Sequence, residues 1–341
     1  MSATSAPPGN PENQLVDRFG RTVNYVRLSV TDRCDLRCVY CMPEKMKFVP
    51  RAQLLTLEEM ESVGRAFISL GVDKIRITGG EPLVRRNILQ LFNHLGAIEE
   101  LKDLTLTTNA TQLKKYAKQL KAAGVTRINI SLDTLKTDRF REMTRVGELK
   151  RTLEGIDAAI ACDFDQIKLN SVVLKNYNHD EMYDLVGYAI DRGIDISFIE
   201  EMPLGENTHH DRAASYYSSD EILADLRQHY EILPATKKTA GPTRYFALTD
   251  HANTHVGFIS PHSHNFCESC NRVRVTAEGR LLLCLGQEHS VDLRRVIRAN
   301  PGDDEALRQA IIDSMEIKPK GHDFNLNSQT VLLRHMNLTG G

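Results

Sequence analysis

The sequence predicts an α/β protein whose parallel sheet forms an open, partial (β/α)6 barrel of the TIM type. The first observation is that short β-branched segments alternate with helical segments across residues 23–200. Strands that alternate with helices in this way pair in parallel through right-handed crossovers. The second observation is that the pattern contains only six strands, which are too few to close an eight-stranded barrel.

The elements follow in order from their β-branched residues, their apolar periodicity and the turn residues between them. The predicted strands are Val23–Val30, Lys74–Thr78, Leu104–Thr108, Arg127–Leu132, Gln166–Leu174 and Ile196–Glu200. The predicted helices are Leu57–Leu70, Asn87–Leu95, Leu113–Ala123, Leu149–Ala161 and Glu181–Arg192.

The ends of these helices have their own signals. Gly71, Gly124 and Gly193 each follow a predicted helix, where a left-handed C-terminal cap favours glycine. Thr56 precedes the first helix and Glu59 lies three residues later, which is the spacing of a capping box.

Composition limits the class of protein. A length of 341 residues suggests about two domains, at roughly 150 residues each. The 43 basic and 45 acidic residues give a net charge of −2, which disfavours a protein that coats nucleic acid or an anionic membrane. We find no secretory signal and no apolar run of the ~18 residues that a membrane span needs, so we expect a cytoplasmic protein.

We expect three regions along the chain. Residues 1–14 are rich in Ser, Pro, Gly and Asn and should form a disordered tail. Residues 15–210 should form the barrel, and residues 211–341 a smaller C-terminal region that contains three of the seven cysteines and ends in Gly-Gly. Within that region we predict strands at Tyr230–Leu233 and Tyr245–Leu248 and a helix at Leu307–Met315.

The predicted strands are polar on one face. Arg27, Arg76 and Lys168 alternate with apolar neighbours, so they share the face opposite the outer helices. The barrel interior should therefore be a wet, cationic cavity suited to an anionic ligand such as a polyphosphate. The alternative is that these side chains are solvated residues at strand edges.

The first cysteine motif is Cys34-x3-Cys38-x2-Cys41, directly after the first strand. Active sites of parallel barrels lie at this end of the strands. Three thiolates can ligate three irons of a [4Fe–4S] cluster and leave the fourth iron open. The alternative is zinc, which would need a fourth ligand, and the closest histidine in sequence is His94.

A second motif, Gly79-Gly80-Glu81-Pro82, ends the second strand. The two glycines allow the backbone to approach a ligand closely, and Glu81 can receive an ammonium group. Glycine-rich turns are common after strands. This one is a stronger indication of a ligand site because it lies one β/α unit after the cysteine loop.

The third motif is Cys267-x2-Cys270-x13-Cys284. It is again a set of three, and zinc with His262 or His264 as fourth ligand is the alternative. Arg272 and Arg274 lie in alternate positions of a strand-like segment and point the same way. The seventh cysteine, Cys162, we interpret as a buried structural residue.

Taken together these motifs resemble those of the radical S-adenosylmethionine (SAM) superfamily and, within it, the GTP 3′,8-cyclase family (molybdenum cofactor biosynthesis protein A). The resemblance extends from about Leu15 to the final Gly-Gly. The matching segments are Arg27–Cys34, Arg76–Pro82, Thr107–Asn109, Asn129–Asp133, Lys168–Asn170, Phe198–Pro203 and Cys267–Thr276.

The resemblance implies a partial barrel with two [4Fe–4S] clusters and SAM as cofactor. Cys34, Cys38 and Cys41 would ligate the first cluster, whose open iron binds SAM, and Cys267, Cys270 and Cys284 the second, whose open iron binds the guanine of GTP. SAM would contact Tyr40, Gly80, Glu81, Ser131 and Met202. GTP would contact Arg27, Arg76, Thr107, Lys168, Arg272, Val273 and Arg274.

The implied reaction converts GTP to (8S)-3′,8-cyclo-7,8-dihydroguanosine 5′-triphosphate, the first step of molybdenum cofactor biosynthesis. A 5′-deoxyadenosyl radical would abstract the hydrogen at ribose C3′. The implied catalytic residues are Arg272 and Arg274, together with Gly340 and Gly341 of a tail that enters the active site. An electron donor and hand-off to a cyclic pyranopterin monophosphate synthase are also implied, and a homodimer is one option for assembly.

Two positions depart from the family pattern. Ser197 stands where the family often has Arg, and Ala110 where it often has Gly in a left-handed turn. The competing hypotheses are another radical SAM enzyme with an auxiliary cluster, acting on a peptide or RNA, and an iron–sulfur electron carrier or redox sensor. The carrier hypothesis leaves the Gly-Gly-Glu motif and the polar interior unexplained.

Overall fold

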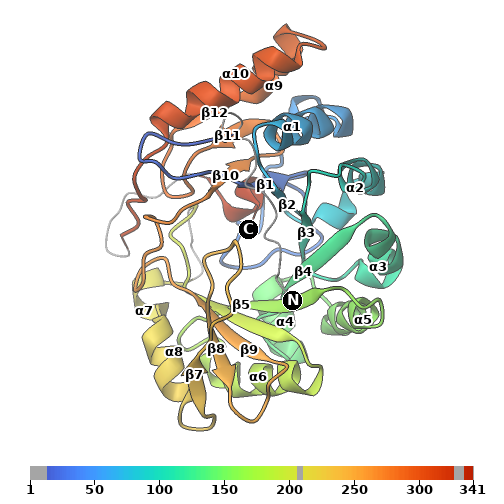
Figure 1. Cartoon of the computed structure of the whole chain (residues 1–341). Coiled ribbons are helices and arrows are strands. Elements are labelled where there is room, and N and C mark those ends of the chain that lie inside the picture. Colours follow the sequence, from blue (N-terminus) through green and yellow to red (C-terminus); the bar gives the residue numbers. More distant parts are fainter. Residues whose placement is uncertain (1–13, 206–209, 326–333, 341) are drawn as a thin grey trace, which may run out of the picture.

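A computed structural model describes residues 14–205, 210–325 and 334–340. Its strands form one curved sheet in the order β12-β11-β10-β1-β2-β3-β4-β5-β6-β9-β8-β7. Figure 1 shows the sheet as an open ring, with α1, α2, α3, α5 and α6 around its outside. The open, partial barrel is therefore confirmed.

The first six strands agree closely with the sequence prediction. They are β1 (Tyr25–Ser29), β2 (Lys74–Thr78), β3 (Asp103–Thr108), β4 (Val125–Ser131), β5 (Gln166–Val172) and β6 (Asp195–Ile199), and every neighbouring pair is parallel. The helices between them are α1 (Leu57–Ser69), α2 (Ile88–Gly96), α3 (Leu113–Ala122), α4 (Thr137–Thr144), α5 (Leu149–Ile160) and α6 (Met182–Asp191).

The predicted helix ends are also confirmed. Thr56 and Glu59 exchange both hydrogen bonds of a capping box. Gly71, Gly124 and Gly193 have φ values of 85°, 85° and 61°. The sequence did not predict α4, which is only eight residues long and contains just two large apolar residues, Phe140 and Met143.

The C-terminal region adds strands to both ends of the barrel. β9 (His255–Ile259) pairs in parallel with β6, and β10 (Arg272–Val275) pairs in parallel with β1. Antiparallel strands then extend each end. They are β7 (Ile232–Pro234) and β8 (Arg244–Leu248) beyond β9, and β11 (Arg280–Leu282) and β12 (Ser290–Asp292) beyond β10.

The remaining helices of the described residues lie outside this sheet or at its mouth. They are α7 (Arg212–Ser215), α8 (Ser219–Leu226), α9 (Leu293–Ala299), α10 (Asp304–Ser314) and α11 (Met336–Thr339). The short 3-10 helices are η2 (Arg51–Gln53), η3 (Pro82–Val84), η4 (His179–Glu181) and η5 (Met315–Ile317). α11, in the red C-terminal segment, lies inside the curve of the sheet (Figure 1). The domain boundary near residue 210 stays a prediction, and the sheet runs without a break across it.

The apolar core lies between the outer face of the sheet and the helices. Ile75, Ile77, Ile128 and Ile130 on the outer face of β2 and β4 are fully buried there. Burial of these faces leaves the alternate, polar residues to line the inside of the barrel. No helix among the described residues has both the length and the apolar character to cross a membrane.

Candidate active site

A large cavity lies inside the barrel, where the parallel strands meet the C-terminal region. Its volume is about 1270 Å³, part of which is open to solvent. Its lining confirms the predicted cationic interior, and such a lining favours a polyanionic ligand. The lining includes the basic residues Arg27, Lys74, Arg76, Arg127, Lys168, Arg272 and Arg274, the cysteines Cys267, Cys270 and Cys284, and Met202, Val273 and Met336.

The pKa of Tyr25 reflects the positive electrostatic potential in this cavity. Its hydroxyl accepts hydrogen bonds from Arg76 Nε at 2.8 Å and from Arg27 Nη1 at 3.3 Å. Burial alone would raise the pKa of the phenol, but the charges of Arg76, Arg27, Lys74 and Arg272 lower it to about 6. Tyr25 was not predicted from the sequence, although it lies two positions before Arg27 on the same face of β1.

Lys168 lies on the opposite wall of the cavity. Its Nζ donates to Thr243 Oγ1 at 3.0 Å and to the Tyr245 hydroxyl at 3.3 Å. Burial and the charge of Arg76 lower the pKa of this lysine to about 7. Lys168 is therefore poised to gain a proton when a phosphate binds beside it. The two C-terminal partners were not predicted from the sequence.

The first cysteine loop is fastened to the Gly-Gly-Glu turn by backbone hydrogen bonds. Gly80 N donates to Thr31 O at 2.7 Å, and Glu81 N donates to Arg33 O at 2.8 Å. A Cβ on Gly80 would lie 2.4 Å from Arg33 O, so no larger residue fits. The close approach predicted for the glycines is thus to the chain's own cysteine loop.

Glu81 fixes this turn from the inside. Its fully buried carboxylate accepts from Leu83 N, Thr108 Oγ1 and Asn109 N at 3.0, 2.9 and 2.7 Å. Burial raises its pKa to about 8, against these hydrogen bonds. Three donors thus already occupy the carboxylate that the sequence suggested for an ammonium group.

The thiols of the first triad lie in surroundings that disfavour a bare thiolate. Burial raises the pKa of Cys34, Cys38 and Cys41, that of Cys41 to about 12, and nearby acidic groups raise all three further. Cys34 Sγ accepts from Leu36 N at 3.3 Å and from Asn109 Nδ2 at 3.7 Å. Ionised sulfurs here need a compensating cation, and the iron of a cluster supplies one.

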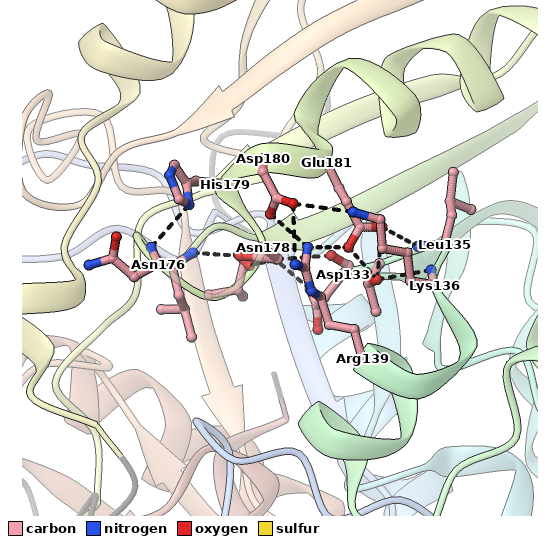
Figure 2. Close-up of polar contacts among 12 residues, drawn as sticks. Asp133, Leu135, Lys136, Arg139, Asn176, Asn178, His179, Asp180 and Glu181 are labelled. Atoms are coloured by element: carbon pink, nitrogen blue, oxygen red, sulfur yellow. Dashed lines mark hydrogen bonds and ion pairs between the residues drawn. The ribbon is translucent and has the colours of Figure 1, made fainter.

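Tyr40, between Cys38 and Cys41, is tied to the end of β4. Its hydroxyl donates to Asp133 Oδ2 at 2.7 Å, and Val172 N donates to Asp133 Oδ1 at 2.9 Å. Figure 2 shows the network behind this contact. Asn178 Nδ2 donates to Asp133 O, and Arg139 bridges Asp180 and the buried Glu181. The loop after β4 is thereby fixed to the segment before α6.

The second triad lies among cations instead. Burial raises the pKa of Cys270, but Lys318 and Arg272 outweigh it, and the pKa falls below its ordinary value. Cys284 keeps a pKa raised by burial. All seven cysteines are free thiols. Cys162, just after α5, packs against the core but is half-buried rather than fully buried as predicted.

The two histidines of the zinc alternative each have one ring nitrogen in a hydrogen bond outside the second triad. His262 Nε2 lies 2.9 Å from Glu201 O, and His264 Nε2 lies 2.8 Å from Asp220 Oδ1. Within the described ranges, no three His, Cys, Asp or Glu side chains converge on a single metal ion. A cluster spreads its ligands over several irons, so triads of free thiols fit it better than they fit zinc.

The C-terminal tail reaches into the cavity. Gly340 O accepts from Arg27 Nη2 at 3.1 Å and from Arg274 Nη1 at 2.8 Å. Gly340 has a φ of 73°, and a Cβ there would lie 2.0 Å from Thr78 Oγ1, so only glycine fits. Asn337 Nδ2 donates to Asp32 O beside the first cysteine loop. Gly341 lies outside the described residues.

The other predicted site residues divide into two groups. Met202 and Val273 line the cavity with the arginines, whereas Thr107 lies one step back, with its Oγ1 3.4 Å from Arg76 Nη1. Tyr40, Gly80, Glu81 and Ser131 are placed beside or beyond the first triad, at the C-terminal ends of the strands, and do not line this cavity.

Several buried polar atoms around the cavity have no partner among the described residues. Asn170 Oδ1 and Arg272 Nε belong to lining residues, and Ser197 Oγ lies in the adjoining strand β6. Unpartnered polar atoms of this kind fit a site that binds a polar ligand. Ala110 has the predicted left-handed conformation, with φ 65°.

Two family profiles match consecutive parts of the chain. The profile of the Radical SAM superfamily matches residues 28–189, and that of Molybdenum Cofactor Synthesis C matches residues 194–324.

Two relatives and one solved structure are also similar to this chain. A GTP 3′,8-cyclase of Saccharophagus degradans is 58% identical, over 96% of this chain and 98% of its own length. A GTP 3′,8-cyclase of Marinobacter nauticus is 56% identical, over 97% of this chain and 100% of its own. The crystal structure of Streptococcus suis SuiB is 16% identical with a TM-score of 0.61, and covers 86% of this chain and 69% of its own, a likeness of fold.

Proposed function

Because the chain belongs to the GTP 3′,8-cyclase family, we infer that it is a radical SAM lyase that converts GTP to (8S)-3′,8-cyclo-7,8-dihydroguanosine 5′-triphosphate. This reaction is the first step of molybdenum cofactor biosynthesis. The observation that supports it best is the cavity itself, which joins a ring of cations to a cysteine triad within one barrel.

As a radical SAM protein the chain uses SAM and a [4Fe–4S] cluster. We propose Cys34, Cys38 and Cys41 as the ligands of that cluster, because the turn of Gly80 and Glu81 fixes their loop at the mouth of the barrel. When bound, the cluster and SAM would supply the 5′-deoxyadenosyl radical chemistry needed for hydrogen abstraction at ribose C3′. For SAM itself we propose contacts with Tyr40, Gly80, Glu81, Ser131 and Met202.

A second [4Fe–4S] cluster on Cys267, Cys270 and Cys284 is the next part of the proposal. These thiols line the same cavity as the cations, so a guanine at the cluster would leave its ribose and triphosphate facing the strands. Free thiols and a lowered pKa at Cys270 support ligation of iron there.

The basic residues would orient GTP for the reaction. We propose that Arg27, Arg76, Lys168, Arg272 and Arg274 bind the triphosphate and ribose, with Thr107 and Val273 beside them. Guanidinium groups bind phosphate oxygens bidentately, and a fixed orientation raises the effective concentration of C3′ at the radical. Closure of the cavity by the tail would exclude water from the radical.

The tail contacts two of these arginines directly. Since Gly340 O accepts hydrogen bonds from Arg27 and Arg274, GTP must share these donors with the tail or replace it. We therefore propose Arg272, Arg274 and the tail glycines Gly340 and Gly341 as the residues closest to the chemistry. An external electron donor, delivery of the product to a cyclic pyranopterin monophosphate synthase and homodimer formation remain predictions.

The test is formation of 5′-deoxyadenosine by anaerobically reconstituted protein with SAM and reductant. We expect GTP to stimulate it and ATP to leave it unchanged. Cleavage that is indifferent to GTP would leave the radical chemistry and exclude GTP as the substrate. No cleavage by protein with verified iron content would exclude the enzyme hypothesis in favour of an iron–sulfur carrier.

A further inference from the structure

Lys318 is a buried lysine that the proposed reaction does not use. It follows η5 and is only 1% exposed, among the most buried large side chains of the protein. Burial of an ammonium group is costly unless a negative partner compensates it. In the part of the chain that the structure describes, no carboxylate lies within 4.0 Å of its Nζ.

The partners of Lys318 belong to the second cysteine triad. Its Nζ lies 3.7 Å from Cys270 Sγ and donates to Leu283 O at 3.1 Å. Leu283 directly precedes Cys284. One ammonium therefore joins the segment before β10 to the segment after β11, and the sulfur is the partner that can supply the missing negative charge.

The segment that contains Lys318 is also linked, through Arg21, to Cys267, the remaining cysteine of the second triad. Arg21 Nη1 donates to Cys267 O at 2.8 Å and to Lys320 O at 2.7 Å, and Arg21 Nη2 donates to Pro319 O at 2.7 Å. The buried Asp17 accepts from Arg21 Nε at 2.6 Å and orients the guanidinium. The position of the lysine beside the sulfur is thus set by a clamp that does not involve the lysine side chain.

The charge of this lysine has an electronic consequence for any cluster on the triad. Hydrogen bonds to ligand sulfurs and net charge set the potentials of iron–sulfur clusters. A cation beside a thiolate stabilises the reduced form, which has one more negative charge.

We propose that Lys318 is a positioning residue that donates to the Cys270 thiolate and raises the reduction potential of the second cluster. The proposal rests on the proposed function, since it needs the second cluster to exist. It adds that the barrel would hold two clusters of unequal potential, with the higher potential at the triad that lines the cavity.

The test compares full-length, anaerobically reconstituted variants by iron content and by redox titration followed by electron paramagnetic resonance. Lys318→Met removes charge and donor at similar length, and Lys318→Arg restores both. The exposed Lys320→Met is the matched control, because only its backbone takes part in the clamp. Each variant is also measured with Cys38→Ala, which silences the first cluster.

We expect Lys318→Met to retain iron. We expect it to lower the equilibrium constant for reduction of the second cluster at least tenfold, which is a fall in potential of about 59 mV for one electron. Lys318→Arg should recover most of this shift, and Lys320→Met should equal the wild type. The proposal would be overturned if Lys318→Met retained its iron and its potential were unchanged. It would also be overturned if Lys318→Arg shifted the potential as much as Lys318→Met does.

Two further outcomes separate this inference from the proposed function. If the Cys38→Ala variant with Lys318 intact binds no iron, the second cluster is absent and the proposed function fails first. If Lys318→Met itself loses iron, Lys318→Gln decides, since it keeps a donor without the charge. A lower potential in that variant supports the proposal, and the wild-type potential contradicts it.

Discussion

The two cysteine triads have the same three thiols and different electrostatic surroundings, although burial keeps the pKa of Cys284 in the second triad raised as well. The first lies beside the carboxyl groups of Asp35, Glu81 and Asp133, and the pKa of each of its thiols is raised. The second lies beside Lys318 and Arg272, and the pKa of Cys270 is lowered. Identical chemistry in the sequence thus acquires different electronic character from groups outside the motifs.

This difference matches the two tasks that the proposed function assigns to the triads. A cluster that must give an electron to a sulfonium benefits from negative surroundings, which lower its reduction potential. A cluster that anchors a polyanionic nucleotide benefits from cations, which attract the ligand and stabilise the reduced cluster. The predictions below test this division, from the largest expected effect to the smallest.

Removal of one cysteine from either triad should abolish a different part of the activity. Cys38→Ala should reduce 5′-deoxyadenosine formation to background, whereas Cys270→Ala should keep uncoupled SAM cleavage and lose its stimulation by GTP. Each variant should lose about half of its iron, because each triad would hold one cluster of equal size. Cys162→Ala, the seventh cysteine, is the control that should retain both activities. Equal losses in both triad variants would contradict the division.

Arg272→Ala should impair the reaction with GTP far more than uncoupled SAM cleavage. Loss of a charge-assisted contact costs about 2 kcal/mol, or roughly thirtyfold in GTP-dependent turnover. Arg280→Ala is the matched control, since Arg280 is an exposed arginine on the neighbouring strand β11. Parallel loss of both activities in Arg272→Ala would exclude a substrate-binding role for this residue.

Tyr40→Phe should affect only the first triad. The change removes the hydroxyl that donates to Asp133 and leaves that buried carboxyl one donor short, at a cost of about 1–3 kcal/mol. We expect the KM for SAM to rise roughly tenfold and the affinity for GTP to stay constant. Tyr188→Phe, on the outer helix α6, serves as the control. A change in GTP affinity would show that the two sites are not separable in this way.

Lys168 should make GTP binding depend on pH. Its pKa of about 7 in the free protein means that it is neutral above pH 7. Because bound triphosphate favours the ammonium form, binding takes up a proton above pH 7 and weakens as the pH rises.

The Kd should increase about threefold between pH 6.5 and 7.5 through this one group. Lys168→Met should bind more weakly and remove this component of the profile, as measured by calorimetry in two buffers of different ionisation enthalpy. An unchanged slope in that variant would assign the titration to another group, of which Tyr25 is the first candidate.

The sequence predicted the first six strands and their helices because these elements repeat a local pattern. It also predicted the cation-lined interior, since the alternation of Arg76 with Ile75 and Ile77 places one face outward and the other inward. It failed for α4, a short helix with only two large apolar residues, and for β9. It identified the segment of Arg272 and Arg274 as strand-like but did not predict that β10 pairs with the distant β1. Parallel pairing over such separations leaves no local signal.

By itself, the sequence determined the grouping of the cysteines into two triads, the turn of Gly79 and Gly80 and the inward face of each strand, because spacing and periodicity are properties of neighbouring residues. Only the tertiary structure decided what surrounds those groups. It brought Lys318 to Cys270 across 48 residues and Gly340 to Arg27 across 313. Electrostatic surroundings depend on distance in space, and the fold alone sets that distance.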